Sequence, residues 1–221
     1  VSEVLRRRIN ERFMHDGVAM LDPDRVYIDA GVEVRAGARI HPDVYLHGTT
    51  MIESGAEIGP GVHATDSSVA SGATVRYAVL EGAAVGPGAN VGPYTYLRPG
   101  ADLGAGAKAG SFVEIKNSQV GQRSKVPHLS YIGDTTIGED SNVGAATITA
   151  NYDGFEKNRT EIGDRVKIGS DTILVAPVSI GDDAYTGAGS VISKDVSPGA
   201  LALERSHQEE IPGYAERRKR R

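Results

Sequence analysis

An aliphatic residue returns at every sixth position through most of this 221-residue chain. A period of six matches neither the 3.6-residue turn of an α-helix nor the two-residue alternation of a β-strand. It is typical of a solenoid of short parallel strands, in which three hexads form one triangular coil. The pattern runs from Ile28 to Ile58, from Val79 to Ile115 and from Ile162 to Ile180. The sequence therefore predicts an all-β prism of about nine coils, stacked ~4.8 Å apart.

The composition agrees with a narrow core and excludes several functional classes. Glycine supplies 28 residues and aromatic residues only 5%, which suits tight corners and a thin column of small aliphatic side chains. A net charge of −5 argues against a nucleic-acid-binding protein. The absence of cysteine rules out disulfides and thiolate metal sites. Since no signal peptide and no apolar run of about 20 residues is present, we expect a cytoplasmic protein without membrane contact.

The two ends of the chain differ from the hexad region. Residues 2–15 place Val4, Leu5, Ile9 and Phe13 on one face, which predicts a short amphipathic helix. The chain does not begin with Met, so we expect it to be part of a longer protein. We therefore divide it into an N-terminal linker over 1–22, a prism over 23–205 and a solvated tail over 206–221.

The period breaks at three places. It shortens by one residue between Ile115 and Val120, and again between Ile132 and Ile137. The longest break follows Thr149, and the additional residues, 150–160, are predicted to leave the prism as a loop. Loops on a rigid scaffold carry binding residues more often than the scaffold itself, although a neutral surface insertion is the alternative.

Two cations, Arg98 and Lys116, lie 18 residues apart, and each follows an inward-facing aliphatic residue. The period therefore stacks them on one face, where like charges on neighbouring strands repel each other. A bound phosphate would relieve this repulsion, with arginine offering a two-pronged donor and lysine a point charge. The alternative is a pair of solvated surface cations.

A second column contains mostly small residues, which predicts a groove for a slender ligand. Its one titratable member is His128, which is suited to proton transfer near neutral pH, although a lone surface histidine is often inert. A histidine-based zinc site is not expected, because His41 and His47 are one hexad apart and so lie on different faces. The column consists of Ser111, His128, Ala145, Ser170 and Ala188.

Several segments resemble a known family. The hexads are similar to the left-handed parallel β-helix of hexapeptide acyltransferases. More narrowly, the chain resembles the C-terminal acetyltransferase half of the bifunctional bacterial enzymes of UDP-N-acetylglucosamine synthesis. The segments that carry this resemblance are NVGPYTYLRPGADL, GSFVEIKNS, KVPHLSYIGD, NVGAATITANYDG, IGSDTILVAPV and ALALERS.

The resemblance implies transfer of an acetyl group from acetyl-CoA to glucosamine-1-phosphate, with His128 as the general base and Glu114 as a supporting residue that orients it. The implied sugar-phosphate ligands are Arg98, Lys116, Tyr131, Asn142 and Lys157. The implied contacts to acetyl-CoA are Ala145, Asn151, Tyr152, Ser170, Ala188 and Arg205.

The resemblance also implies a homotrimer with active sites shared between copies. It implies that residues 1–22 join the prism to a uridyltransferase half, and that Mg²⁺ is needed only in that half. We expect no metal in this chain. Two alternatives stay open: an acyltransferase of this fold that acts on another amino sugar or on serine, and a non-enzymatic prism used for assembly.

Overall fold

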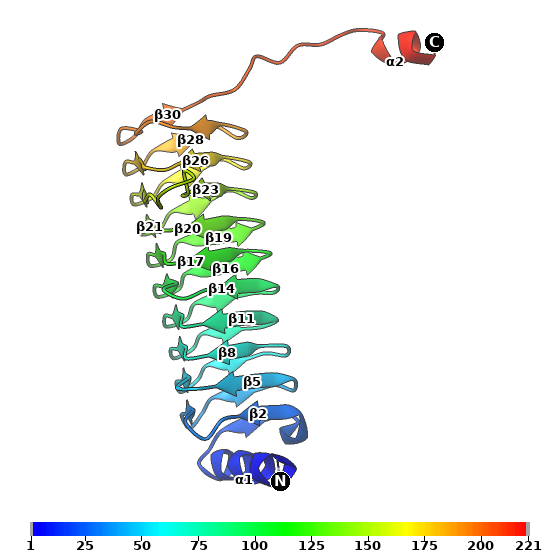
Figure 1. The fold of residues 1–221 in the computed structure, drawn as a ribbon, viewed down its shortest axis with the longest axis vertical. Helices are drawn as coiled ribbons and strands as arrows, with labels where there is room; N and C mark the ends of the chain where they lie inside the picture. The colour runs from blue at the N-terminus through cyan, green and yellow to red at the C-terminus, as the bar shows by residue number, and fades with distance from the viewer. Residues whose placement is uncertain (1, 220–221) are drawn as a thin grey trace.

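The computed structural model describes residues 2–219, which form an elongated β-solenoid with a helix at its N-terminal end (Figure 1). The strands form three parallel sheets, named here A, B and C, of 11, 10 and 9 strands. Each coil contributes one short strand to each sheet, so the prism has about ten coils. This is the architecture that a left-handed hexapeptide-repeat β-helix requires.

Sheet A contains β1 (Ala19–Met20), β4 (Arg39–Ile40), β7 (Glu57–Ile58), β10 (Thr74–Val75), β13 (Asn90–Val91), β16 (Lys108–Ser111), β19 (Lys125–His128), β22 (Asn142–Val143), β25 (Lys167–Ile168), β28 (Tyr185–Thr186) and β30 (Leu201–Ala202). Sheet B contains β2 (Val26–Ile28), β5 (Val44–His47), β8 (His63–Thr65), β11 (Ala78–Glu81), β14 (Thr95–Leu97), β17 (Glu114–Lys116), β20 (Tyr131–Gly133), β23 (Ile148–Ala150), β26 (Ile173–Val175) and β29 (Val191–Ile192). Sheet C contains β3 (Glu33–Val34), β6 (Met51–Ile52), β9 (Ser68–Val69), β12 (Ala84–Val85), β15 (Asp102–Leu103), β18 (Gln119–Val120), β21 (Thr135–Ile137), β24 (Thr160–Ile162) and β27 (Val178–Ile180).

The core is a single column of aliphatic side chains that runs along the axis of the prism. Each inward residue lies directly above its equivalent one coil earlier, as Ile115 lies on Leu97. A single coil cannot bury its apolar side alone, so stability comes from stacking neighbouring coils. The largest side chains that are fully buried in this column are Ile40, Leu46, Ile52, Ile58, Leu80, Leu97, Leu103, Ile115, Ile132, Ile137, Leu174 and Ile180.

The structure corrects two details of the predicted period. The prism has about ten coils instead of nine, because β1 already pairs with β4 ahead of residue 23 and β30 follows the last predicted hexad. Val79 does not face inward: it is 39% exposed, whereas Leu80 is fully buried. The corner that follows Leu80 turns through a single left-handed residue, Gly82 (φ 52°), and is therefore one residue shorter than the period requires.

The N-terminal helix α1 (Ser2–His15) covers the first coil. Phe13 is buried and Ile9 packs against the core, but Val4 and Leu5 are about half exposed, so only part of the predicted apolar face is used. Asn10 is buried, and its side-chain amide donates to the carbonyls of Pro23 and Val26, which lie at the start and just past the end of the short 3₁₀ helix η1 (Pro23–Arg25). The helix thus closes the open end of the apolar column.

Beyond β30 the chain leaves the prism as an extended segment that ends in the short helix α2 (Tyr214–Lys219) (Figure 1). The predicted linker and tail include residues 1 and 220–221, which lie outside the described residues. Within residues 2–219, no helix combines the length and apolar character needed to cross a lipid bilayer.

Candidate active site

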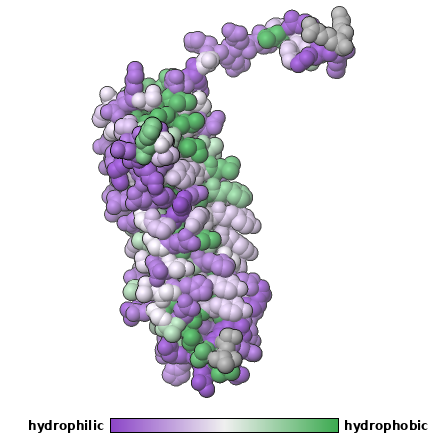
Figure 2. Space-filling view, viewed as in Figure 1, coloured by the Kyte–Doolittle hydropathy of each residue, from purple (hydrophilic) through white to green (hydrophobic). Residues whose placement is uncertain are grey.

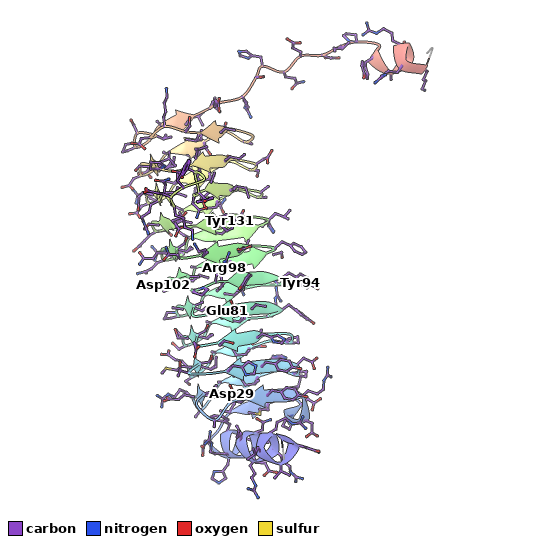
Figure 3. The ribbon with its side chains drawn as sticks, in the orientation of Figure 1. Asp29, Glu81, Tyr94, Arg98, Asp102 and Tyr131 are labelled. Carbon is purple, nitrogen blue, oxygen red and sulfur yellow. The ribbon has the colours of Figure 1, made fainter. Side chains whose placement is uncertain are left out.

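The outer face of sheet B carries the two cations that the period had aligned. Figure 3 shows Glu81, Arg98 and Tyr131 one above another on this face. Arg98 is not an isolated cation, because its Nη1 donates to Oε1 of Glu114 at 2.8 Å. This hydrogen bond raises the pKa of Arg98 above its usual value.

Lys116 lies one coil above Arg98 and also has an acidic partner. Its Nζ lies 3.6 Å from Oδ2 of Asp134, and both side chains are largely buried. Each stacked cation therefore has an internal carboxylate. The expected repulsion is balanced within the chain, and an added anion would have to compete with Glu114 and Asp134.

Lys157 reaches the same face from the inserted loop. The nearby Lys116 ammonium lowers the pKa of Lys157 below its usual value. Lys116 keeps a raised pKa, because its side chain interacts with Lys157 and Asp134. The two lysines thus form a pair in which Lys157 gives up its proton more readily.

The insertion is a hairpin-like loop between β23 and β24, and Ala150 and Thr160 belong to these two strands. Tyr152 and Lys157 form an antiparallel bridge across it. Asp153 accepts backbone hydrogen bonds from Phe155 (2.8 Å) and Glu156 (2.7 Å), which lower its pKa. This internal bonding gives the loop a defined shape even though its tip is exposed.

His128 ends strand β19 at the edge between sheets A and B, where it is exposed. It pairs directly with Ser111 of the preceding coil. Its carbonyl accepts a hydrogen bond from Ser130 Oγ at 2.7 Å, which stabilises the turn that follows the histidine.

A ladder of backbone hydrogen bonds along this edge shows that the predicted small-residue column exists. In each step, the residue after one column member donates to the carbonyl of the member one coil below. Arg205 continues the column at its upper end, because its Nη1 donates to the carbonyl of Ala188 at 2.8 Å. The carbonyls that accept in this ladder belong to Ser111, His128, Ala145 and Ser170.

The column and the loop do not lie side by side, contrary to the predicted groove between them. The column follows the edge between sheets A and B, whereas the loop leaves at the edge between sheets B and C, after Ala150 and before Thr160. The face of sheet B, with Arg98 and Lys116, separates the two. This arrangement makes the face of sheet B the floor of the candidate site and places His128 and the loop at its two margins.

Two other predicted residues have different surroundings from those expected. Asn142 projects from sheet A, between Lys125 and Lys167, and so lies on another face than Tyr131. Glu114 bonds to Arg98, and no hydrogen bond joins it to His128 in the part of the chain that the structure describes. Asn151 is buried at the root of the loop, whereas Tyr152 is mostly exposed.

Two features near the candidate site were not predicted from the sequence: a buried aspartate beneath the loop and a row of aromatic residues below His128. Asp134 receives hydrogen bonds from Asn117 and Asn151 and lies under the root of the loop. The shortened step between Ile132 and Ile137 was the available signal for this corner. Along the edge below His128, three exposed aromatic residues with left-handed backbones lie one above another: Tyr77, Tyr94 and Phe112. The rings of Tyr94 and Phe112 are stacked, and those of Tyr77 and Tyr94 are tilted against each other.

The apolar surface is uneven along the prism. Figure 2 shows apolar side chains gathered toward the C-terminal end of the face in view. The exposed aliphatic residues of sheet B in this region are Ile148, Ile173, Val175 and Val191, each between 37% and 41% exposed. Within residues 2–219, no three His, Cys, Asp or Glu side chains are grouped as a metal site requires.

Comparison with known proteins finds similarity to a bacterial transferase family and to longer bifunctional proteins. Residues 159–194 match the family described as bacterial transferase hexapeptide (six repeats). The chain is 49% identical over 218 residues to the bifunctional protein GlmU of Streptomyces coelicolor, covering 97% of this chain and 45% of that protein. It is 52% identical over 208 residues to the bifunctional protein GlmU of Kineococcus radiotolerans, covering 94% of this chain and 42% of that protein. The chain thus spans less than half the length of these relatives.

Solved structures support the fold. The UDP-N-acetylglucosamine acyltransferase of Francisella novicida matches 81% of this chain and 65% of its own, with a TM-score of 0.58 and 13% identity. The UDP-N-acetylglucosamine O-acyltransferase of Moraxella catarrhalis matches 88% of this chain and 76% of its own, with a TM-score of 0.52 and 18% identity. At these identities the likeness extends to the fold alone.

Proposed function

We propose that this chain, a hexapeptide-repeat β-helix homologous to part of the bifunctional protein GlmU, transfers the acetyl group of acetyl-CoA to the amine of glucosamine-1-phosphate. The observation that carries the proposal is the layout of sheet B. Arg98 and Lys116 lie on its face, with His128 at one margin and the loop that carries Lys157 at the other. A phosphorylated amino sugar presents the two groups that this layout suits, an anion and a nucleophilic amine.

The chemistry assigned to His128 is general base catalysis. The amine nitrogen attacks the thioester carbonyl of acetyl-CoA while the imidazole accepts a proton from that nitrogen. The carbon–nitrogen bond forms, the carbon–sulfur bond breaks, and the CoA thiolate leaves and takes up a proton. His128 is exposed on the edge of the prism, which leaves its ring accessible to both substrates.

Acetyl-CoA is assigned to the edge column above His128. Ala145, Ser170 and Ala188 have small side chains that leave room for a slender cosubstrate. Arg205 is held at the upper end of this column by its bond to Ala188, where it would meet the CoA phosphates. Asn151 and Tyr152, at the start of the loop, are assigned to the cosubstrate near the reacting groups.

The sugar phosphate is assigned to Arg98, Lys116, Tyr131 and Lys157 on the face of sheet B. A phosphate placed here would add negative charge beside Glu114 and Asp134 and would favour the protonated form of Lys157. Arginine supplies the directional pair of donors and the lysines supply charge.

We also propose that the active unit is a trimer. Asn142 and Tyr131 project from different faces of one prism, so both can bind one sugar phosphate only if a second copy supplies one of them. The exposed aliphatic patch on sheet B offers a surface of the kind that protein contacts bury. Co-expressing Arg98→Ala with Asn142→Ala should restore activity in mixed trimers if the copies share sites, and should restore none if each copy is self-sufficient.

The longer proteins that this chain matches are named bifunctional. We propose that the protein containing this chain also carries a magnesium-dependent uridyltransferase outside residues 1–221, and that this chain needs no metal for acetyl transfer.

The test of the proposed reaction is acetyl-CoA-dependent thiol release with different acceptors. Glucosamine-1-phosphate should give the highest kcat/KM, ahead of glucosamine and of serine. A preference for serine or for another amino sugar would favour the alternative acyltransferase function. A rate equal to that without acceptor would contradict acetyl transfer and leave the assembly function.

A further inference from the structure

Asp134 is the only charged residue among those whose side chains are buried within residues 2–219, and the reaction described above assigns it no catalytic step. It lies at the corner between β20 and β21, with its backbone in the left-handed region (φ 50°). A buried carboxylate is costly unless hydrogen bonds and opposite charge compensate it. The contacts of Asp134 therefore indicate what this residue holds in place.

Asp134 is bonded to both ends of the inserted loop. At the start of the loop, the Asn151 side-chain amide donates to Oδ2 of Asp134. At the end of the loop, the Thr160 backbone N–H donates to the carbonyl of Asp134 at 3.3 Å. Asp134 thus holds both ends of the loop, Asn151 and Thr160, against the prism.

The same carboxylate is also tied to the floor of the site. Its Oδ1 accepts a hydrogen bond from the side chain of Asn117, one coil below, and its Oδ2 lies 3.6 Å from Nζ of Lys116. The backbone N–H of Asp134 donates to the carbonyl of Lys116 at 3.0 Å. Asp134 therefore connects Lys116, on sheet B, with the loop that carries Lys157.

The prism itself does not require an aspartate at this corner. The equivalent corners one and three coils below are turned by Asn117 and Gly82, which are exposed and also have positive φ values. Only Asp134 is buried, because the loop covers it. A role limited to turning the corner would be served equally by the glycine found at Gly82.

We propose that Asp134 is a positioning residue that docks the inserted loop and sets the spacing between the Lys116 and Lys157 ammonium groups. Its link to sugar-phosphate binding rests on the proposed function. The loop-docking role concerns the protein without ligand and is tested separately.

The charge state of Asp134 agrees with this role. Burial raises the pKa of its carboxyl, but hydrogen bonds from Asn117 and Asn151 and the charges of Lys116 and Lys157 outweigh burial, so the pKa lies below its usual value. The carboxylate is therefore ionised at neutral pH and contributes negative charge close to Lys116 and Lys157.

The first experiment measures hydrogen exchange of residues 151–160 in the ligand-free protein. Asp134→Asn keeps the size of the side chain and tolerates the left-handed backbone, but it removes the charge and puts an amide donor against two other donors. Exchange in the loop should accelerate about tenfold or more while exchange in the coils stays unchanged. Asn117→Gly, which copies the corner at Gly82, should produce a smaller change of the same kind.

The matched control is Asp183→Asn. Asp183 also has a left-handed backbone (φ 58°) and pairs with an arginine, Arg165, but it is exposed and lies away from the loop. It should leave loop exchange unchanged. Unaltered loop exchange in Asp134→Asn, or equal acceleration throughout the prism, would overturn the proposal.

The second experiment measures kinetics with the same variants. In Asp134→Asn, KM for glucosamine-1-phosphate should rise about tenfold, while KM for acetyl-CoA and kcat change less than about twofold, because the loop cation is misplaced. An equal loss in kcat with unchanged KM would contradict a positioning role at the phosphate. If the wild type does not use glucosamine-1-phosphate, the proposed function fails, and the exchange measurement alone decides the role of Asp134.

Discussion

The guanidinium of Arg98 donates to the carboxylate of Glu114, 2.8 Å away on the next strand of sheet B. A phosphate that binds Arg98 must therefore displace or share this carboxylate. The pair keeps the guanidinium aligned on the face of the sheet before substrate arrives, at the cost of a competing negative charge.

This relationship predicts how Arg98→Ala should behave. Loss of a charge-assisted pair of hydrogen bonds should raise KM for glucosamine-1-phosphate by about tenfold or more, with little change in KM for acetyl-CoA. Glu114→Gln is the comparison, since it removes the competing charge and keeps the guanidinium. Steady-state kinetics that give both variants the same defect would indicate that Arg98 serves only as the partner of Glu114.

His128→Ala should lower kcat by about 10²–10⁴ if the imidazole is the general base. The fold should be unaffected, because the side chain is exposed at the end of β19. Thiol release from acetyl-CoA measures the rate, and thermal unfolding checks the fold. His207→Ala, in the extended C-terminal segment, is the control, and an unchanged rate in His128→Ala would remove this residue from catalysis.

The lowered pKa of Lys157 predicts that binding of the sugar phosphate depends on pH. Its pKa lies below the usual lysine value of 10.5 because Lys116 is near. In the free protein, the charge on Lys157 is lost at a lower pH than in an ordinary lysine, and a bound phosphate raises the pKa again. Affinity should therefore fall as the pH rises through the lowered pKa, and binding should take up protons there.

Calorimetry with N-acetylglucosamine-1-phosphate tests this, because the acetylated nitrogen of that ligand does not titrate. The phosphate itself gains its second negative charge at a pKa of ~6, which strengthens binding as the pH rises and is therefore opposite in sign to the loss of charge on Lys157. Lys157→Arg should remove the decline in affinity, since arginine stays protonated throughout. A decline of the same size in Lys157→Arg would assign it to another group.

Leu80 and Val79 test the register of the prism. Leu80→Ala should destabilise the protein by about 2–5 kcal/mol, because it opens a cavity in a column one side chain wide. Val79→Ala should change stability by less than about 1 kcal/mol, because this side chain is exposed on sheet B. Denaturant unfolding compares the two, and the reverse order of effects would restore the register in which Val79 faces inward.

Regular features of the prism followed from the sequence alone. The six-residue spacing predicted the parallel solenoid, because only a short strand followed by a tight corner repeats on that length. The alignment of Leu97 with Ile115, and so of Arg98 with Lys116, required only that equivalent residues stack between coils. The same reasoning identified the edge column from Ser111 to Ala188 and the loop after Thr149.

The assignment failed where two neighbouring residues were both aliphatic. Val79 and Leu80 satisfy the hydrophobic pattern equally well, and a corner shortened at Gly82 decides between them. A one-residue difference in corner length carries no hydrophobic signal of its own, so the period could not detect it.

The sequence by itself determined which residues stack on one face, because stacking depends only on a repeated length. The tertiary structure alone decided how the faces and edges meet. It separated His128 from the loop by the width of sheet B, placed Asn142 on sheet A, and gave each stacked cation its own carboxylate. It also buried Asp134 beneath both ends of the loop. These relationships depend on the direction of each corner and on side chains from different coils that meet in space, and neither is contained in the spacing of residues along one chain.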